Sequence, residues 1–100
     1  MANQLASLPW VVDTPSNTVL FTGHMKIDHM EFVGYGAATD QVEVQDLNGR
    51  LVALLKGNSD LNVVSTWENV GWVRGLKVPT TLTSGGGPNL PSGKLIIYQP

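Results

Sequence analysis

The sequence predicts an all-β fold, a single-domain β-sandwich or small barrel of about seven short antiparallel strands. Short segments rich in β-branched and aromatic residues alternate between apolar and polar positions, as half-buried strands do. Clusters of Gly, Pro, Asn and Asp separate these segments, and the chain contains 11 Gly and 6 Pro. Residues 1–9 show no such period. We therefore expect an N-terminal arm over residues 1–9, followed by a sandwich domain over residues 10–100.

The first two strands are short. Residues 10–12 are apolar and precede a cluster of turn-forming residues at 13–17. Residues 18–22 are again rich in β-branched and aromatic side chains. We expect Gly23 to end this second strand.

The longest strand expected covers residues 24–33. Apolar residues occupy one phase of the alternation as far as Ile27 and the opposite phase from Met30 onward. A change of phase by one residue is the signature of a β-bulge. The sequence therefore predicts a bulge near Asp28 and His29.

A hairpin follows, with its turn at Asn48-Gly49. Residues 41–45 alternate cleanly, and Val42 and Val44 are expected to face the core. An Asn-Gly pair is typical of a two-residue type I′ turn. The returning segment, residues 51–55, is apolar in both phases, so we expect both of its faces to be covered.

The second half of the chain is less regular. Residues 56–60 are turn-forming, and residues 61–65 fit either a strand or an irregular crossing. Residues 66–70 could form one helical turn, although the glycines that follow disfavour a longer helix. We expect two closing strands at residues 73–78 and 94–99.

Composition excludes several classes of function. The six Lys and Arg residues are scattered, and the net charge is −2, so the electrostatic basis for nucleic-acid binding is missing. The chain has no Cys, which fits a reducing compartment and excludes disulfides and thiol catalysis. No apolar run approaches the ~20 residues of a membrane span. The first ten residues lack the features of a signal peptide.

Two histidines are the candidate ligands for a metal ion in this chain. His24 and His29, with Asp28 and Glu31 nearby, contain the ligand types of a transition-metal site. On a regular strand the two histidines would point to opposite faces, but the predicted bulge could bring them together. Since no further ligand is evident, we expect ordinary strand histidines, no metal and no cofactor.

No catalytic constellation is evident. The chain has Ser, His and Asp residues but no Ser in a G-x-S-x-G elbow. Ser84 precedes three glycines, whose backbone N–H groups could face an anion, yet no P-loop Lys-Ser/Thr follows. We interpret residues 84–92 as a flexible Gly/Pro loop and expect no catalytic residues and no enzymatic activity.

The three tryptophans are candidates for the core or for a contact surface. We assign Trp72 to the core, because large aromatic side chains dominate the cores of small domains. We expect Trp67 to be partly exposed, since tryptophan is enriched at interface hot spots. Trp10 fits either environment.

The order of several motifs resembles that of small structural proteins of tailed bacteriophages. In those proteins a strand and a short Gly/Thr/Asp loop lead into a "V-x-V-x-D-x-x-G" hairpin, and the chain closes with a Trp, "G-L-x-V-P-T-L" and "G-x-L-x-I-Y". This chain departs from the pattern by its arm and by the insertion at residues 85–92. The segments that carry the resemblance are Lys26-Ile-Asp-His-Met-Glu-Phe-Val-Gly34, Ala37-Ala-Thr-Asp40, Val42-Glu-Val-Gln-Asp-Leu-Asn-Gly-Arg-Leu-Val52, Trp72, Gly75-Leu-Lys-Val-Pro-Thr-Thr-Leu82 and Gly93-Lys-Leu-Ile-Ile-Tyr98.

The resemblance implies a virion protein made in the host cytoplasm, and among virion proteins we favour a capsid cement or decoration protein. Its expected partners are the major capsid protein and copies of itself, with a trimer as one arrangement, and neither nucleic acid nor a membrane. A tail or neck component and a carbohydrate- or receptor-binding β-module are the alternatives. The arm and the Gly/Pro loop, which we expect to be ordered mainly by other subunits, supply most of the candidate assembly contacts: Leu5, Leu8, Trp10, Trp67, Gly85, Gly86, Gly87, Pro88, Asn89 and Leu90.

Overall fold

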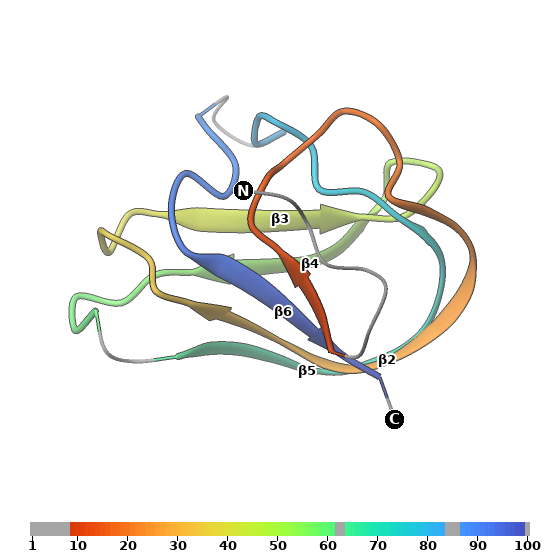
Figure 1. Cartoon of the computed structure of the whole chain (residues 1–100), viewed down its shortest axis with the longest axis horizontal. Helices are drawn as coiled ribbons and strands as arrows, with labels where there is room; N and C mark the ends of the chain where they lie inside the picture. The colour runs from red at the N-terminus through yellow and green to blue at the C-terminus, as the bar shows by residue number, and fades with distance from the viewer. Residues whose placement is uncertain (1–8, 62–63, 84–86, 100) are drawn as a thin grey trace.

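A computed structural model of the protein describes residues 9–61, 64–83 and 87–99. The prediction of an all-β fold is confirmed, because the described residues form six strands and no helix (Figure 1). Within these residues, no helix has the length and apolar character needed to cross a membrane. The strands are β1 (Trp10–Val12), β2 (Phe21–Val33), β3 (Gln41–Gln45), β4 (Leu51–Lys56), β5 (Ser65–Leu76) and β6 (Lys94–Tyr98).

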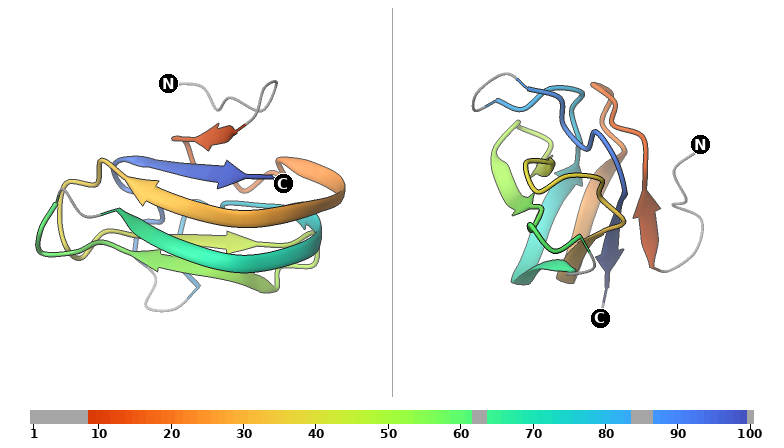
Figure 2. Two further views of the ribbon diagram at one scale, coloured as in Figure 1. Left: turned by 90° about the horizontal axis from the view of Figure 1, so that it is seen from below. Right: turned by 90° about the vertical axis from the view of Figure 1, so that its left-hand side faces the viewer.

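The strands form two antiparallel sheets that pack as a sandwich. One sheet has four strands in the order β1-β6-β2-β5, and the other pairs β3 with β4. Figure 2 shows the smaller sheet lying over the β5 side of the larger one. Backbone hydrogen bonds join the sheets at one corner, where the N–H groups of Gln45 and Lys77 each donate to the other residue's carbonyl over 2.8 Å. The sandwich is thus tied along one corner and is not closed into a barrel.

The predicted phase change in β2 is confirmed. The register of β2 against β5 shifts between Ile27 and His29, and buried residues continue on the other phase at Met30 and Phe32. The prediction that Gly23 ends a strand is wrong, because β2 runs through it as a single strand of 13 residues. A second register shift, between Phe21 and His24, accommodates the glycine without breaking the pairing with β5.

Residues 66–70, which could have formed one helical turn, are part of a strand instead. These residues belong to β5, a strand of 12 residues that pairs with β2 along its length. Gly71 and Gly75 have φ angles of +83° and +79°, so the strand passes two irregular positions that other residues would resist. Pairing with a long neighbour therefore outweighs the weak local preference of this segment.

The hairpin strands are confirmed, and Val42 and Val44 are fully buried. The turn of the hairpin differs from the prediction. A type I′ turn needs a positive φ at both central residues, and only Gly49 has a positive φ, of +80°. Gly49 N–H donates to the Asp46 carbonyl, which is the pattern of a type I turn followed by a left-handed glycine. The expectation that both faces of the returning strand are covered fails at Leu51, which is 60% exposed.

The core lies between the sheets and draws on every strand. β6 pairs with β1 on one side and with β2 on the other, so the last strand sits inside the larger sheet. The fully buried core side chains include Val12, Ile27, Met30, Phe32, Val42, Val44, Leu55, Leu76, Val78, Leu95 and Ile97.

Candidate binding face on the larger sheet

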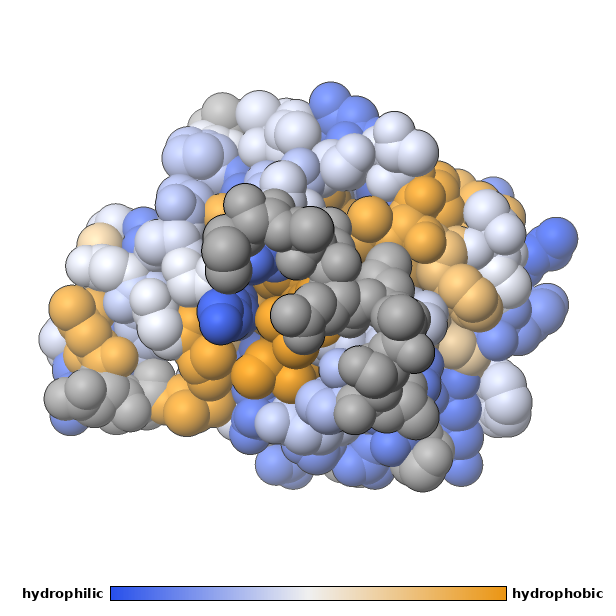
Figure 3. Space-filling model, viewed as in Figure 1, coloured by the Kyte–Doolittle hydropathy of each residue, from blue (hydrophilic) through white to orange (hydrophobic). Residues whose placement is uncertain are grey.

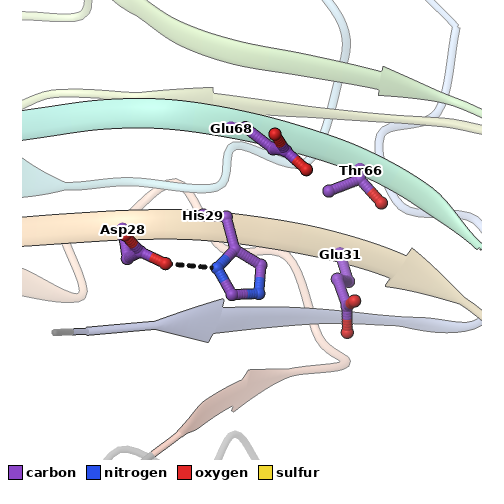
Figure 4. A pocket seen from close by; sticks show the side chains of 5 residues that line it. All are labelled: Asp28, His29, Glu31, Thr66 and Glu68. Atoms are coloured by element: carbon purple, nitrogen blue, oxygen red, sulfur yellow. Dashed lines mark hydrogen bonds and ion pairs between the residues drawn. The ribbon is translucent and has the colours of Figure 1, made fainter.

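The register shift in β2 creates a polar hollow on the side of the larger sheet that faces away from the core. The shift leaves both Asp28 and His29 on this outward side, although they are neighbours in a strand. The hollow is about 380 Å³ in volume. Figure 4 shows His29 between Asp28 and Glu31 on β2, facing the same side as two residues of β5. The residues that line the hollow are Asp28, His29, Glu31, Thr66 and Glu68.

His29 is held in one orientation by two neighbours. Its Nδ1 atom lies 2.7 Å from a carboxylate oxygen of Asp28. Its ring stacks on Tyr98 of β6, with 4.3 Å between ring centroids and 13° between the planes. A hydrogen bond to Glu31, with smaller contributions from burial and from the Glu31 charge, raises the pKa of the Tyr98 phenol above its usual value. The positions of His29 and Tyr98 are therefore fixed by their contacts with each other and with Asp28 and Glu31.

Charge is segregated along this surface, which we call the β2–β5 outer face. It consists of the outward side chains of β2 and β5. Pairing across the strands places His24 opposite Arg74 and Lys26 opposite Trp72, which form a basic half. The acidic half is the hollow, where three carboxylates surround His29. The residues of the acidic half are Asp28, His29, Glu31, Thr66 and Glu68.

The bulge brings His24 and His29 to the same face of β2, as the metal hypothesis required. His24 nevertheless pairs with Arg74, at the basic end of the face, whereas His29 pairs with Glu68. Among the residues that the structure describes, no group of three or more His, Cys, Asp or Glu side chains is arranged to hold a metal ion. The structure therefore gives the metal hypothesis no ligand set within the described residues.

The assignment of Trp72 to the core is wrong. Trp72 is 71% exposed and lies on the β2–β5 outer face. The neighbouring residue Val73 takes the inward position instead, opposite the buried Met25. The sequence held a signal for this arrangement, because Trp72 shares its phase with Arg74, and two residues apart on a strand face the same side.

The other two tryptophans occupy intermediate environments. Trp67 is 40% exposed, which confirms its expected partial exposure. It lies opposite Met30 on the inward side, but β5 ends its sheet, so one flank is uncovered. Trp10 is partly buried against the core, and its ring meets Phe21 edge-on with 5.2 Å between centroids.

The candidate contacts of the arm and the Gly/Pro loop divide into two groups. Leu5, Leu8, Gly85 and Gly86, together with Ser84, lie outside the described residues. The structure describes the remaining candidate residues of the loop, and these residues contact the domain itself. Pro88 is exposed and bridges to Thr81, and the carbonyl of Gly87 accepts a hydrogen bond from Leu82 N–H.

The expectation that other subunits order this loop is wrong for Asn89 and Leu90, which are buried in the domain. Asn89 is 1% exposed, and its amide accepts a hydrogen bond from Glu43 N–H over 2.6 Å. The amide also donates to the Glu43 carbonyl over 3.0 Å and to the Pro79 carbonyl over 2.8 Å. Leu90 N–H donates to the Gln41 carbonyl. The buried side-chain amide of Asn89 thus holds this segment in place, although the sequence shows no strand periodicity here. Neither Asn89 nor Leu90 is free to contact another subunit.

Glu43 is a buried carboxylate that the sequence did not single out. It is 3% exposed and accepts hydrogen bonds from Gln45 Nε2 over 2.6 Å and from the Thr83 hydroxyl over 2.9 Å. The bond from Thr83 holds the segment after β5 against β3. Because residues 41–45 alternate between Val and polar residues, the pattern predicts a solvated polar face, and only the covering segment reveals that this face is buried.

Five large apolar side chains among the described residues are exposed. They lie on β4, on β5 and in the loop between them, and β4 and β5 are each the last strand of their sheet. Figure 3 shows apolar residues reaching the surface in several places, with polar residues between them. We call this set the β4–β5 side, and it consists of Leu51, Leu61, Val64, Trp67 and Trp72.

Comparisons with protein-family models, with curated proteins and with solved structures found no match for this chain.

Proposed function

We propose that this chain is a non-enzymatic structural protein of a tailed-phage virion, and specifically a capsid cement or decoration protein that binds the major capsid protein. The class comes from the motifs that resemble those of phage structural proteins. The observation that carries the proposal at the level of the molecule is the β4–β5 side, where five large apolar side chains are exposed. Large exposed apolar side chains on two edge strands and on the loop that joins them offer anchor points for another protein.

Burial of these side chains supplies the binding energy in this proposal. A Leu or Val side chain gains about 1.5–3 kcal/mol when it leaves water completely. Tryptophan adds a large rigid surface and is enriched among residues that dominate interfaces. Several partial burials of this kind support a contact of moderate strength, and repetition over a capsid lattice adds avidity without new contacts.

A rigid domain suits a mechanical role. The core is filled from both sheets, and the segment around Asn89 is fixed to β3 by buried hydrogen bonds. A contact surface that is already ordered loses little conformational entropy on binding. The domain would therefore act as a preformed clamp between capsid subunits rather than as a segment that folds on the shell.

Capsid binding and shell stability test the proposal. Heads of the source virus that lack the protein would be mixed with the purified chain, and bound protein and the temperature of head rupture would be measured. We expect saturable binding and a higher rupture temperature. The double variant Leu51→Ser/Trp67→Ser should bind at least about tenfold more weakly, as loss of two apolar anchors implies.

The matched control is Thr22→Ala, which changes an exposed residue of β2 outside the β4–β5 side. Equal binding by the control and the wild type is expected. If heads neither bind the protein nor gain stability, the proposed function is wrong. If the double variant binds as well as the wild type, the β4–β5 side is not the contact.

A carbohydrate-binding module, for example in a tail tip, is the second candidate. The observation that favours it is the exposure of Trp72 on the same face as the carboxylates of the acidic half. Aromatic faces stack on sugar rings, and carboxylates accept hydrogen bonds from hydroxyl groups. Quenching of tryptophan fluorescence by host-surface oligosaccharides, lost in Trp72→Ala, would support this candidate over capsid binding.

A further inference from the structure

We propose that the β2–β5 outer face is a self-association surface, on which a second copy of this chain packs face to face about a two-fold axis. The inference goes beyond the proposed function and does not depend on it, because it concerns the purified protein alone.

Charges along the face are ordered by sign. The basic half carries Lys26 and Arg74, and the acidic half carries Asp28, Glu31 and Glu68. A two-fold axis that lies in the plane of the interface, at right angles to the strands and midway along the face, places each half of one copy over the opposite half of the other. The face is therefore complementary to itself, which is what an isologous interface requires.

The same order argues against other macromolecules as the preferred occupant. A partner with one dominant charge would meet a matching half and a repelling half in every orientation. A second copy meets two matching halves at once. The net charge of −2 is also small enough that two copies do not repel each other strongly at a distance.

Trp72 supplies the apolar part of the contact. It is 71% exposed and lies opposite Lys26, on the side of the basic half that adjoins the hollow. Near the axis, each copy's Trp72 would be covered by the other copy. Tryptophan near the centre of an interface, with polar groups around it, is the usual arrangement of a binding hot spot.

The size of the face sets the expected affinity. Residues 24–31 of β2 span roughly 26 Å, and two adjacent strands are roughly 10 Å wide, so each copy offers on the order of 260 Å². The total of about 500 Å² is below the roughly 1,000 Å² that a stable interface buries. We therefore expect a weak, transient dimer that forms only at high protein concentration and depends clearly on salt.

Sedimentation velocity of the purified protein over a range of concentrations, at low and at high salt, tests the inference. The wild type should shift from monomer to dimer with rising concentration, and high salt should weaken the dimer. The double variant Lys26→Glu/Arg74→Glu makes the whole face acidic and should weaken association by at least about tenfold.

The matched control is Arg50→Glu/Lys56→Glu, which makes the same change in net charge on exposed residues of the β3–β4 hairpin. This control should dimerise as the wild type does. Circular dichroism and thermal unfolding would establish that each variant is folded before its association is compared.

A mixing experiment tests the two halves together. Asp28→Lys/Glu68→Lys makes the face basic, so this variant alone should be monomeric. Mixed with Lys26→Glu/Arg74→Glu it should form heterodimers, and mixed with the hairpin control it should associate more weakly.

Monomeric wild-type protein at every concentration would overturn the inference, as would a dimer that the outer-face variants leave unchanged. Trimers that depend on this face would overturn the two-fold arrangement. A monomeric protein that still binds heads would leave the proposed function intact, so the two failures are distinguishable.

Discussion

Replacement of Asn89 by Ala should remove the attachment that fixes the segment after β5 to β3. The Asn89 amide is 1% exposed and makes three hydrogen bonds to the backbone of Glu43 and Pro79, at 2.6, 3.0 and 2.8 Å. Alanine would leave one buried N–H group and two carbonyls without these partners. Each buried group left unsatisfied costs about 1–3 kcal/mol, so we expect the three groups together to cost at least about 3 kcal/mol. Domains of this size are stable by about 5–15 kcal/mol, and the melting temperature should fall by at least about 12 °C.

Urea unfolding followed by tryptophan fluorescence measures this loss. Asn89→Asp is the sharper test, because the carboxylate can still accept from Glu43 N–H but would face two carbonyls without a donor. It should therefore destabilise at least as much as alanine. The control is Asn48→Ala, at an exposed position of the hairpin loop, which should change stability by less than about 0.5 kcal/mol. A loss in Asn89→Ala no larger than in the control would refute the assigned role.

Two further perturbations follow from the geometry. In thermal unfolding, Gly93→Ala should destabilise the fold far more than Gly71→Ala. Both glycines have positive φ, but a Cβ on Gly93 would lie 2.3 Å from the Val33 carbonyl oxygen. A Cβ on Gly71 would meet nothing within 4 Å. Equal losses would show that backbone strain alone, about 1–2 kcal/mol, accounts for both. In an ultraviolet titration Tyr98 should ionise at a higher pH than in Glu31→Gln, because the hydrogen bond to Glu31 raises its pKa. The stabilisation linked to this raised pKa is fully present below pH about 10 and is lost as the pH rises through the folded-state value, so stability of the wild type should fall there more than that of the variant. Identical titrations of the two proteins would contradict the contact.

Periodicity predicted those parts of the fold in which burial alternates on one strand. The change of phase between Ile27 and Met30 predicted the bulge near Asp28, because inward positions must be apolar on both sides of it. The alternation around Val42 and Val44 likewise predicted the hairpin strands. The bulge also placed Asp28 and His29 side by side, which is the part of the candidate face that the sequence could indicate.

The remaining features depend on pairing partners that are distant in sequence. Gly23 looked like a strand end because its local preference is weak, but pairing with β5 carries β2 through it. In the sequence, Asn89 looked like a loop residue and Glu43 looked like a solvated strand residue. Both are buried because their segments, which are 46 residues apart in the chain, pack against each other. Trp72 was misplaced because size was weighed above phase, whereas its exposed neighbour in phase, Arg74, indicated the outward side.

The most direct test of the proposed virion role is where the protein sediments among particles of its source. Particles released from the source culture would be separated on a density gradient, and the chain would be quantified in the fractions of heads, tails and free protein. The proposal predicts co-sedimentation with heads, in a fixed ratio to the major capsid protein that reflects many copies per head. Recovery in the tail fraction alone would favour the tail component. Recovery only as free protein at the top of the gradient would contradict a virion role.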